Sequence, residues 1–337
     1  MKYCKLGKTG LQVSEIAFGC GNIGGLMVRG GEQEQLDAVT HALELGINYF
    51  DTAPLYGNGK SETNLGRVLA QLRSNVMVAT KVSINMDNLK DIRGTVQSSL
   101  EISLRRLGRD YIDVLQIHTP ITLKRGESQQ WSVSLTDVLS TNGIADAFES
   151  VRSQKLVRYI GFTGLGEAAA LQRVIDSDRF DLIQAYYNLL NPSAGYDMKP
   201  GFIGYNFGNL INLAMERNMG VVVIRVMAGG ALGGKAARTG HASASVGGAV
   251  VPGATYEMDE TRSARLNFLL VNDITSLPQA AVRFALMHQG VSTVLVGFSD
   301  IKQIDEAVGC SGKGNLPESA FERLTNLWST DFGIGKV

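Results

Sequence analysis

The sequence contains little cysteine, and its cysteines lie far apart. Among its 337 residues there are 3 cysteines, Cys4, Cys20 and Cys310. A disulfide framework or a cysteine-based metal site needs more cysteines at closer spacing. The sequence therefore argues against a disulfide-rich secreted domain. It predicts a protein of a reducing compartment that binds no metal.

Net charge and long apolar runs are also absent. The chain has 32 basic and 32 acidic residues, and no basic stretch is interleaved with aromatic residues, so nucleic acid is not an expected partner. The best apolar run, Val221 to Val226, contains Arg225 and is too short to cross a membrane. Residues 1–5 lack the apolar core of a signal peptide. We therefore expect a cytoplasmic protein without nucleic-acid or membrane partners, and the sequence carries no signal for an oligomeric state.

What the chain does contain is a regular alternation of strand-like and helical segments. Hydrophobic residues make up 44% of the chain and charged residues 19%, which is ordinary for a globular protein with a large core. Short apolar runs predict strands at 16–19, 48–51, 77–81, 112–118, 157–162, 182–186, 221–226 and 294–296. Apolar residues at helical spacing predict helices at 32–45, 62–72, 92–107, 144–155, 168–175, 210–217, 278–289 and 301–308. This alternation predicts parallel βαβ units, so we expect an α/β fold in which residues 1–337 form a single (β/α)8 TIM barrel.

Two additions to the barrel are expected at the ends of the chain. Residues 3–6 and 11–13 flank a turn that contains Gly7 and Gly10, which predicts an N-terminal β-hairpin that plugs the barrel floor. Residues 317–328 predict an additional C-terminal helix.

Several long loops are expected at the rim of the barrel. The glycine-rich segment 20–31 allows the backbone to approach a ligand closely. The loops at 119–135, 191–209 and 228–258 have no pattern that names a substrate. Residues 228–253 are rich in glycine and alanine, which is typical of an active-site lid or of a mobile loop.

Three successive predicted strands end in residues capable of acid–base chemistry. The run Asn48 to Asp51 ends in an aspartate, the next strand ends at Lys81, and the third ends at His118. Tyr56 follows in the turn after Asp51. The C-terminal ends of parallel barrel strands form the rim at which active sites lie. We therefore expect these side chains to lie close together.

These residue types suit proton transfer to a carbonyl oxygen. A phenol has a pKa of about 10, which a neighbouring ammonium lowers by stabilising the phenolate. Lys81 would supply that ammonium beside Tyr56, and Asp51 would keep Lys81 protonated. A ring N–H of His118 would orient the carbonyl oxygen. None of these side chains provides hydride, so the site implies a nicotinamide cofactor.

Structural roles remain alternatives for each of these residues taken alone. A single Asp, Lys or His at a strand end is more often a cap or part of a structural ion pair. Lys81 at the end of a barrel strand is also compatible with a Schiff-base nucleophile, which would make the protein a lyase.

The sequence resembles the aldo-keto reductase superfamily over nearly its whole length. The resemblance is carried by the opening segment 5–14, by Asp51-Thr52-Ala53 with Tyr56-Gly57, by Ala79-Thr80-Lys81, by 103–113 and by 157–161. It implies a (β/α)8 barrel and NAD(P)(H)-dependent interconversion of a carbonyl, in an aldehyde, ketone or sugar, with the corresponding alcohol. It also implies that Tyr56 is the general acid/base, that Lys81 and Asp51 tune its acidity, and that His118 orients the substrate.

The same resemblance suggests which residues hold the nicotinamide. Asp51 would contribute to the cofactor site as well as to catalysis. Family members hold the carboxamide with a Ser-Asn pair and a glutamine. Here Thr163-Gly164 replaces the pair, and Gln184 matches the glutamine. Arg225 stands where an aromatic residue usually stacks on the ring, so its guanidinium either stacks there or pairs with an acid on the rim.

The adenosine end of the cofactor would lie after the last barrel strand. Gly297, Phe298, Ser299, Gln303 and Glu306 match the family's adenosine-binding segment, and a helix N-terminus near Ser299 suits a phosphate. The family as a whole favours NADP(H), but the 2′-phosphate is usually held by Arg or Lys, which are missing from these positions. NAD(H) or dual use is therefore also expected.

A second class of function is compatible with the same residues. Redox-sensing regulatory subunits that resemble potassium-channel β-subunits share this barrel and bind nicotinamide. The four residues Asp51, Tyr56, Lys81 and His118 do not separate the two classes, although the chain shows no additional docking tail. The main interpretation is an enzyme that acts on a small-molecule carbonyl or alcohol substrate.

Overall fold

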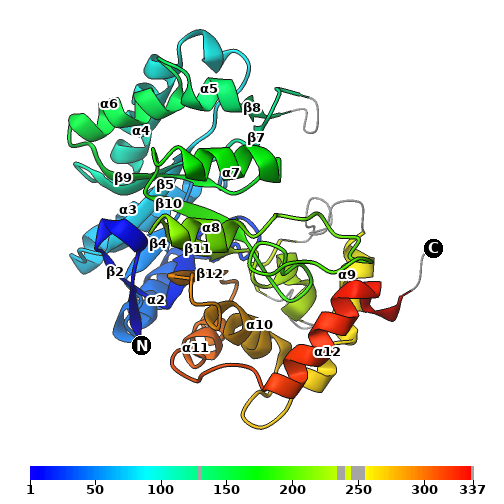
Figure 1. Ribbon diagram of the computed structural model, residues 1–337. Helices are drawn as coiled ribbons and strands as arrows, with labels where there is room; N and C mark the ends of the chain where they lie inside the picture. Colours follow the sequence, from blue (N-terminus) through cyan, green and yellow to red (C-terminus); the bar gives the residue numbers. More distant parts are fainter. Residues whose placement is uncertain (127–130, 234–239, 244–254, 335–337) are drawn as a thin grey trace.

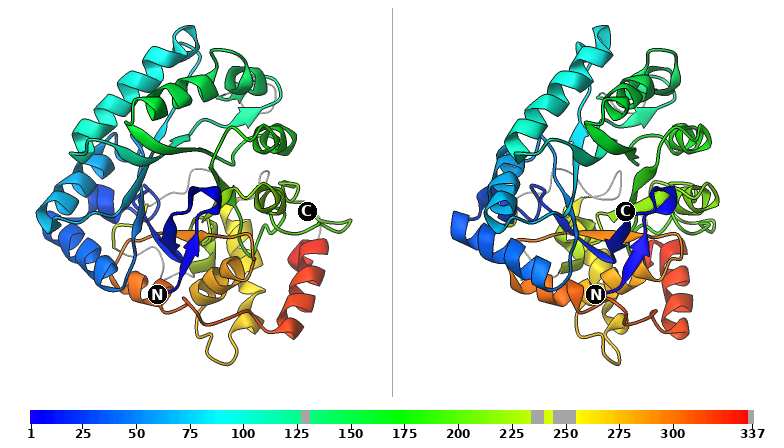
Figure 2. Two further views of the ribbon diagram at one scale, coloured as in Figure 1. Left: turned by 60° about the vertical axis from the view of Figure 1, so that its left-hand side comes forward. Right: turned by 90° about the vertical axis from the view of Figure 1, so that its left-hand side faces the viewer.

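Eight parallel strands form a closed barrel with helices around it, as Figures 1 and 2 show. The structure is a computed structural model that describes residues 1–126, 131–233, 240–243 and 255–334. The strand order around the barrel is β10-β11-β12-β3-β4-β5-β6-β9, so each strand pairs with the next barrel strand along the chain, and β12 closes onto β3. The strands are β3 (Ile16–Gly19), β4 (Tyr49–Asp51), β5 (Met77–Val82), β6 (Ile112–Ile117), β9 (Val157–Thr163), β10 (Leu182–Tyr186), β11 (Gly220–Ile224) and β12 (Thr293–Gly297). The predicted (β/α)8 fold is confirmed.

Helices cover the outside of this barrel. They are α1 (Leu26–Arg29), α2 (Glu32–Glu44), α3 (Lys60–Leu72), α4 (Ile92–Leu107), α5 (Leu135–Leu139), α6 (Ile144–Ser153), α7 (Ala168–Asp176), α8 (Leu210–Glu216), α9 (Tyr256–Ala264), α10 (Leu277–Leu286), α11 (Lys302–Val308) and α12 (Glu318–Ser329). The predicted C-terminal helix is α12, whose Trp328 packs on Phe284 of α10 with ring centroids 5.8 Å apart.

Side chains inside the barrel form layers because alternate residues of a strand face the same side. The lower layer is apolar and consists of Ala17, Tyr49, Ala79, Val114, Leu182 and Val222, which form one buried cluster with Leu6 and Val13. Two residues further along four of these strands, the inward side chains are Asp51, Lys81, Gln116 and Gln184. A polar layer therefore lies directly above an apolar floor.

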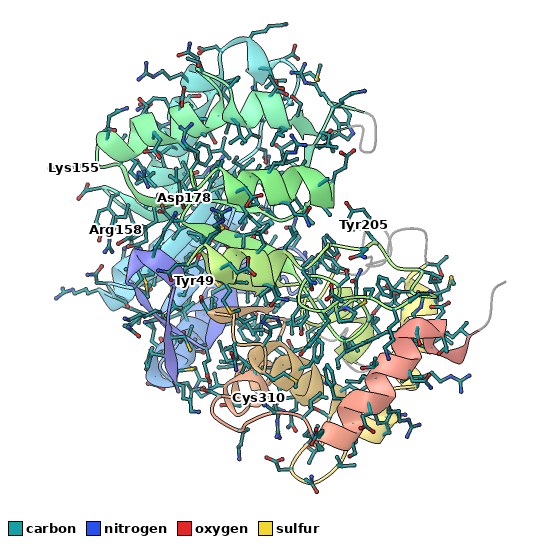
Figure 3. The ribbon with its side chains drawn as sticks, viewed as in Figure 1. Tyr49, Lys155, Arg158, Asp178, Tyr205 and Cys310 are labelled. Atoms are coloured by element: carbon teal, nitrogen blue, oxygen red, sulfur yellow. The ribbon has the colours of Figure 1, made fainter. Side chains whose placement is uncertain are left out.

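The N-terminal hairpin closes the floor of the barrel. Strands β1 (Tyr3–Lys5) and β2 (Gln12–Ser14) pair antiparallel, and Figure 2 shows them lying across the end of the barrel. Lys8, in the turn of the hairpin, forms an ion pair with Asp178. Figure 3 labels Asp178 on the same side of the molecule as Tyr49, a residue of the apolar floor. Tyr159 also donates to the carbonyl oxygen of Thr9 (2.8 Å). The predicted hairpin is thus present, and it blocks this end of the barrel to ligands.

Strand β11 is shorter at its C-terminal end than the sequence predicts. The prediction extended the strand to Val226, but the strand ends at Ile224. Arg225 has a φ of 60°, a left-handed conformation that cannot continue a strand. The residues after it therefore leave the barrel wall.

Three segments predicted as loops contain regular structure. The segment 20–31 includes α1, and the segment 119–135 includes the short pair β7 (Ile121–Thr122) and β8 (Val133–Ser134). The long loop 228–258 begins with a 3-10 helix (Ala228–Gly233) and ends within α9. Residues 234–239 and 244–254 of that loop lie outside the described residues, and so does most of the segment predicted as a lid.

The sequence does not predict helix α9, because this helix lacks an apolar stripe. Thr255 caps it by accepting from the backbone N–H of Met258, and Arg262 forms ion pairs with Asp259 (3.0 Å) and Asp331 (2.9 Å). The buried Arg262 therefore anchors the helix by polar contacts, which a search for apolar periodicity misses.

Candidate active site

The polar layer of the barrel holds the four side chains that the sequence singled out. Asp51 ends β4, Lys81 is the penultimate residue of β5, and His118 directly follows β6. Tyr56 lies in the turn between β4 and α3. Since neighbouring parallel strands end at the same rim, the four residues meet at its C-terminal end.

Lys81 joins Asp51 to Tyr56. Its Nζ forms an ion pair with Asp51 Oδ1, donates to the carbonyl oxygen of Thr52 (2.8 Å) and lies 3.4 Å from Tyr56 Oη. The side chains of Lys81 and Asp51 are each only 1% exposed. Burial lowers the pKa of Lys81, but the charges of Asp51 and Tyr56 and the hydrogen bonds to both side chains together outweigh that effect, so the pKa is raised overall. Lys81 is therefore a buried, protonated ammonium.

The phenol of Tyr56 is subject to opposing effects. Burial raises its pKa, and the charge of Lys81 lowers it, as does the more distant guanidinium of Arg225. The net direction is upward, so the hydroxyl holds its proton at neutral pH and can donate it. Once the proton has left, the phenolate faces the ammonium at 3.4 Å.

His118 lies against Tyr56 and is uncharged. The two rings are edge to face, with centroids 5.7 Å apart, and Nδ1 lies 3.5 Å from Ser83 Oγ. Burial and the nearby Lys81 lower the pKa of His118 to about 3. A neutral imidazole offers one N–H donor and one acceptor.

The sequence interpretation missed Gln116 as a member of this site. Its Nε2 donates to Asp51 Oδ2 (3.1 Å), and Gln184 Nε2 donates to the same oxygen (2.6 Å). Burial raises the pKa of Asp51, while Lys81 and these two amides oppose that rise. The available signal was the position of Gln116 two residues after Val114 in β6, because alternate residues of a strand face the same side.

A cavity of about 530 Å³ opens above the polar layer. Asp51, Tyr56, His118, Thr163, Gln184 and Arg225 all line it, together with glycines of the segment 19–24. Lys81 lies beneath this lining, in contact with Tyr56. The predicted catalytic residues and the predicted nicotinamide contacts therefore surround one space.

Thr163 and Arg225 retain polar groups with no partner among the described residues. The Oγ1 of Thr163 is buried without a hydrogen bond, in a strand that pairs Thr163 with Gln184. Arg225 is exposed, lines the cavity and makes no ion pair within the described part of the chain. The expected alternative, an ion pair with a rim acid, is not found there.

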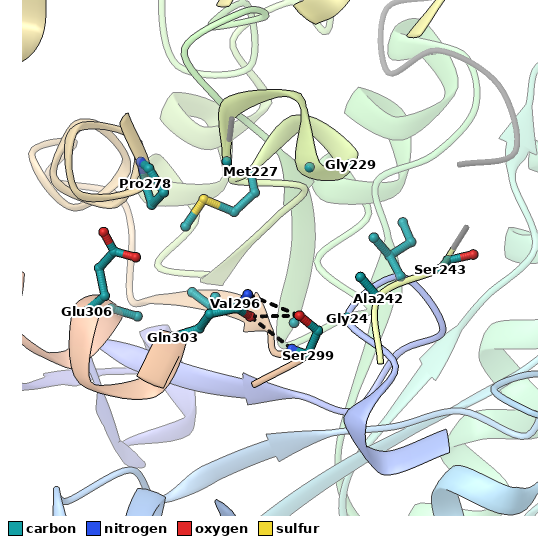
Figure 4. A pocket seen from close by; sticks show the side chains of 15 residues that line it. Gly24, Met227, Gly229, Ala242, Ser243, Pro278, Val296, Ser299, Gln303 and Glu306 are labelled. Carbon is teal, nitrogen blue, oxygen red and sulfur yellow. Dashed lines mark hydrogen bonds between the residues drawn. The ribbon is translucent and has the colours of Figure 1, made fainter. Parts of the chain in front are cut away.

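A second cavity, of about 250 Å³, adjoins the first and is shown in Figure 4. Gly24, Met227, Gly229 and Gly297 line both cavities. A Cβ on Gly24 would lie 2.6 Å from the backbone of Phe298, so only glycine permits this close approach.

The predicted adenosine contacts fall into two groups. Ser299, Gln303 and Glu306 line the second cavity, where the Ser299 N–H donates to the side-chain oxygen of Gln303 (2.9 Å). Phe298 lines neither cavity, because its buried ring packs on Phe18 with centroids 5.0 Å apart. No lysine or arginine is present among the described lining residues.

The described residues lack two features. They contain no group of three or more His, Cys, Asp or Glu side chains placed to hold a metal ion. Within the same ranges, no helix has the length and apolar character needed to cross a membrane.

Comparison with known proteins identifies similar chains. L-galactose dehydrogenase of Arabidopsis thaliana is 29% identical over 310 residues, which are 90% of this chain and 86% of that protein. D-threo-aldose 1-dehydrogenase of Pseudomonas sp is 26% identical over 347 residues, covering 95% and 93% of the two chains. The solved holo form of aldo-keto reductase AKR11C1 from Bacillus halodurans has a TM-score of 0.71 at 25% identity, covering 97% of this chain and 96% of that chain.

The family assignment rests on a match to nearly the whole chain. The family model described as Aldo/keto reductase family matches residues 15–329, which include every residue of the candidate site. The chain therefore belongs to the aldo/keto reductase family.

Proposed function

We propose that this protein is a nicotinamide-dependent oxidoreductase that interconverts a small carbonyl compound and its alcohol, with Tyr56 as the general acid/base. The observation that carries the proposal is the chain of contacts from Asp51 through Lys81 to Tyr56 at the base of the central cavity. This arrangement holds one proton on Tyr56 and stabilises the phenolate left when that proton departs.

In the direction of reduction, Tyr56 gives its proton to the carbonyl oxygen while the carbonyl carbon gains hydride, which yields the alcohol. When bound, a reduced nicotinamide supplies that hydride. Lys81 stabilises the resulting phenolate, and the neutral His118 donates one N–H to the carbonyl oxygen. In the direction of oxidation, the Tyr56 phenolate takes the hydroxyl proton.

The residues around the central cavity fit a nicotinamide group. Thr163 offers a buried hydroxyl without a partner, and Gln184 on the neighbouring strand lines the same space. A carboxamide would give the hydroxyl of Thr163 the hydrogen bond it lacks. We assign Arg225 to the same cofactor, because its guanidinium faces the cavity without a competing acid in the described residues.

The lining of the second cavity, at the adenosine end, favours binding of NAD over NADP or binding of both with similar affinity. A 2′-phosphate carries a charge of about −1.5 to −2, by analogy with other phosphate monoesters. The described lining offers it Ser299 and Gln303 but no cation, and Glu306 adds a carboxylate. We therefore expect discrimination within about tenfold, or 1.4 kcal/mol.

The environment of Lys81 argues against a Schiff-base mechanism. A lysine must lose its proton to attack a carbonyl, and the ion pair with Asp51 opposes that loss. Incubation with aldehyde substrate and borohydride should therefore leave Lys81 unmodified, as peptide mass mapping would show.

The substitution Tyr56→Phe tests the assignment directly, since it removes the hydroxyl and keeps the ring. Turnover should fall by about 10² to 10⁴, the range for loss of general acid catalysis. Cofactor affinity, measured by quenching of protein fluorescence, should change little. Retention of more than about a tenth of the activity would exclude Tyr56 as the acid/base. If the wild type shows no turnover beyond one bound cofactor, the redox-sensing subunit becomes the better interpretation.

A further inference from the structure

A third cavity, of about 280 Å³, adjoins the central one beside His118. His118 and Leu165 line both spaces, so a molecule in the third cavity reaches the reacting centre without crossing the cofactor site. This cavity is therefore the candidate pocket for the part of the substrate beyond its carbonyl group.

Three large apolar side chains with high exposure line this pocket. Leu55 is 59% exposed, Met86 is 52% exposed and Trp131 is 69% exposed. They come from three separate segments: the turn after β4, the segment after β5 and the segment before β8. Exposed apolar groups that gather at one cavity mark a binding surface, whereas scattered ones need no explanation.

The polar side chains in this lining are largely occupied by the protein itself. Thr119 Oγ1 accepts from the backbone N–H of Ile84 (2.7 Å) and donates to the carbonyl oxygen of the same residue (3.0 Å). Ser132 Oγ contacts Thr122 Oγ1 (2.9 Å) and the N–H of Gly126 (3.2 Å).

The side-chain oxygen of Asn85 is likewise already hydrogen-bonded within the protein. Its Oδ1 accepts from the N–H groups of Asp87 and Asn88, each at 3.0 Å. A sugar needs hydrogen-bond partners for several hydroxyl groups at once, because each unpaired polar group loses its bonds to water. This lining offers few free partners for that purpose.

The described residues of the lining also carry no formal charge. No Asp, Glu, Lys or Arg lines the pocket among the described residues, and His118 is neutral. A carboxylate or phosphate on the substrate would lose its hydration here without gaining an opposite charge.

From these contacts we propose that the substrate is an uncharged aldehyde or ketone with an aryl or alicyclic ring, and that Trp131 is the main determinant of its selection. The proposal rests on the carbonyl–alcohol function proposed above. The carbonyl group lies at Tyr56 and His118, and the ring lies against Trp131, with Leu55 and Met86 completing the apolar wall. The names of the sugar-oxidising relatives point to polyhydroxylated substrates, whereas this wall selects against them.

The test is a comparison of kcat/KM for four aldehydes. Cyclohexanecarbaldehyde and benzaldehyde represent the proposed class, D-erythrose represents polyhydroxy aldehydes, and 4-formylbenzoate adds a negative charge to benzaldehyde. We expect the two apolar aldehydes to exceed both other compounds by about tenfold or more, since one well-placed apolar contact supplies that much discrimination.

Trp131→Ala tests the assigned residue. It should raise KM for benzaldehyde about tenfold and leave kcat unchanged, because Trp131 contacts substrate and transition state equally. Ile102→Ala is the control, since Ile102 is an exposed apolar residue on α4 that lines none of the cavities above. It should change neither constant.

Two results would overturn the proposal. One is a higher kcat/KM for D-erythrose or 4-formylbenzoate than for the apolar aldehydes, and the other is an unchanged KM in Trp131→Ala. Both leave the carbonyl–alcohol function standing. Absence of turnover with every aldehyde and with the matching alcohols would instead remove the proposed function itself.

Discussion

Replacing Lys81 by methionine removes the charge that connects Asp51 to Tyr56 and keeps much of the side-chain volume. The ammonium lies 3.4 Å from the phenol oxygen. At an effective dielectric constant of about 20, this distance corresponds to roughly 5 kcal/mol of attraction for the phenolate. The opposing charge of Asp51 cancels part of this energy. We therefore expect kcat to fall by about 10²- to 10³-fold.

The pH dependence separates a role in catalysis from a role in folding. Lys81 lowers the pKa of Tyr56, so its removal raises that pKa. Oxidation requires the phenolate and reduction requires the phenol. The rise of kcat with pH in oxidation and its fall with pH in reduction should therefore both move to higher pH. The assay is the absorbance of the reduced nicotinamide, followed across pH in the wild type and in Lys81→Met.

Lys81→Met also leaves Asp51 buried without its partner, which destabilises proteins by about 3–5 kcal/mol. The double variant Lys81→Met, Asp51→Asn removes both charges and provides a folded alternative if the single variant unfolds. Lys302→Met is the control, because Lys302 is exposed and lines none of the cavities. A pH profile of kcat that stays in place in a folded, active variant would show that Lys81 does not tune Tyr56.

Three further predictions concern the cofactor, the support of Asp51 and stability. Ser299→Arg should shift the cofactor preference towards NADP, because a guanidinium binds a phosphate with two hydrogen bonds. Titration of the protein with each cofactor measures this preference. A wild-type preference for NADP above about a hundredfold would contradict the prediction. Gln116→Leu should lower kcat several-fold and change its pH profile, because Asp51 loses one of its hydrogen-bond donors. An unchanged pH profile in this variant would show that Gln116 only fills space. Gln116→Glu tests whether the site tolerates a second acid. His118 has a pKa of about 3 in the fold, below the usual value of 6.5, so its contribution to the free energy of unfolding is complete above pH 6.5 and is lost as pH falls towards 3. Urea unfolding at pH 5 and pH 7 should show a smaller difference in His118→Gln than in the wild type.

Much of the architecture and the position of the site follow from local patterns in the sequence. The alternation of apolar strands and amphipathic helices predicts the barrel, because parallel strands need helical crossovers. Asp51, Lys81 and His118 come at the ends of consecutive strands, and such ends share one rim. Their proximity therefore needed no knowledge of distant contacts.

Other features depend on contacts between residues far apart in the chain. Gln116 and Gln184 reach the same oxygen of Asp51 from different strands. The alternation within β6 places Gln116 on the inner face of the barrel, but it does not show the contact with Asp51. Phe298 matched a cofactor-binding segment, yet its ring turns into the core against Phe18.

Tertiary structure also decided the elements that lack apolar periodicity. Helix α9 is anchored by ion pairs of Arg262 with Asp259 and with the distant Asp331, and charge pairs leave no periodic signal. The pocket of Leu55, Met86 and Trp131 is assembled from three loops, and no loop alone shows that these three side chains meet. A sequence records which groups are present, but the direction of each side chain depends on the packing of strands and loops around the closed barrel.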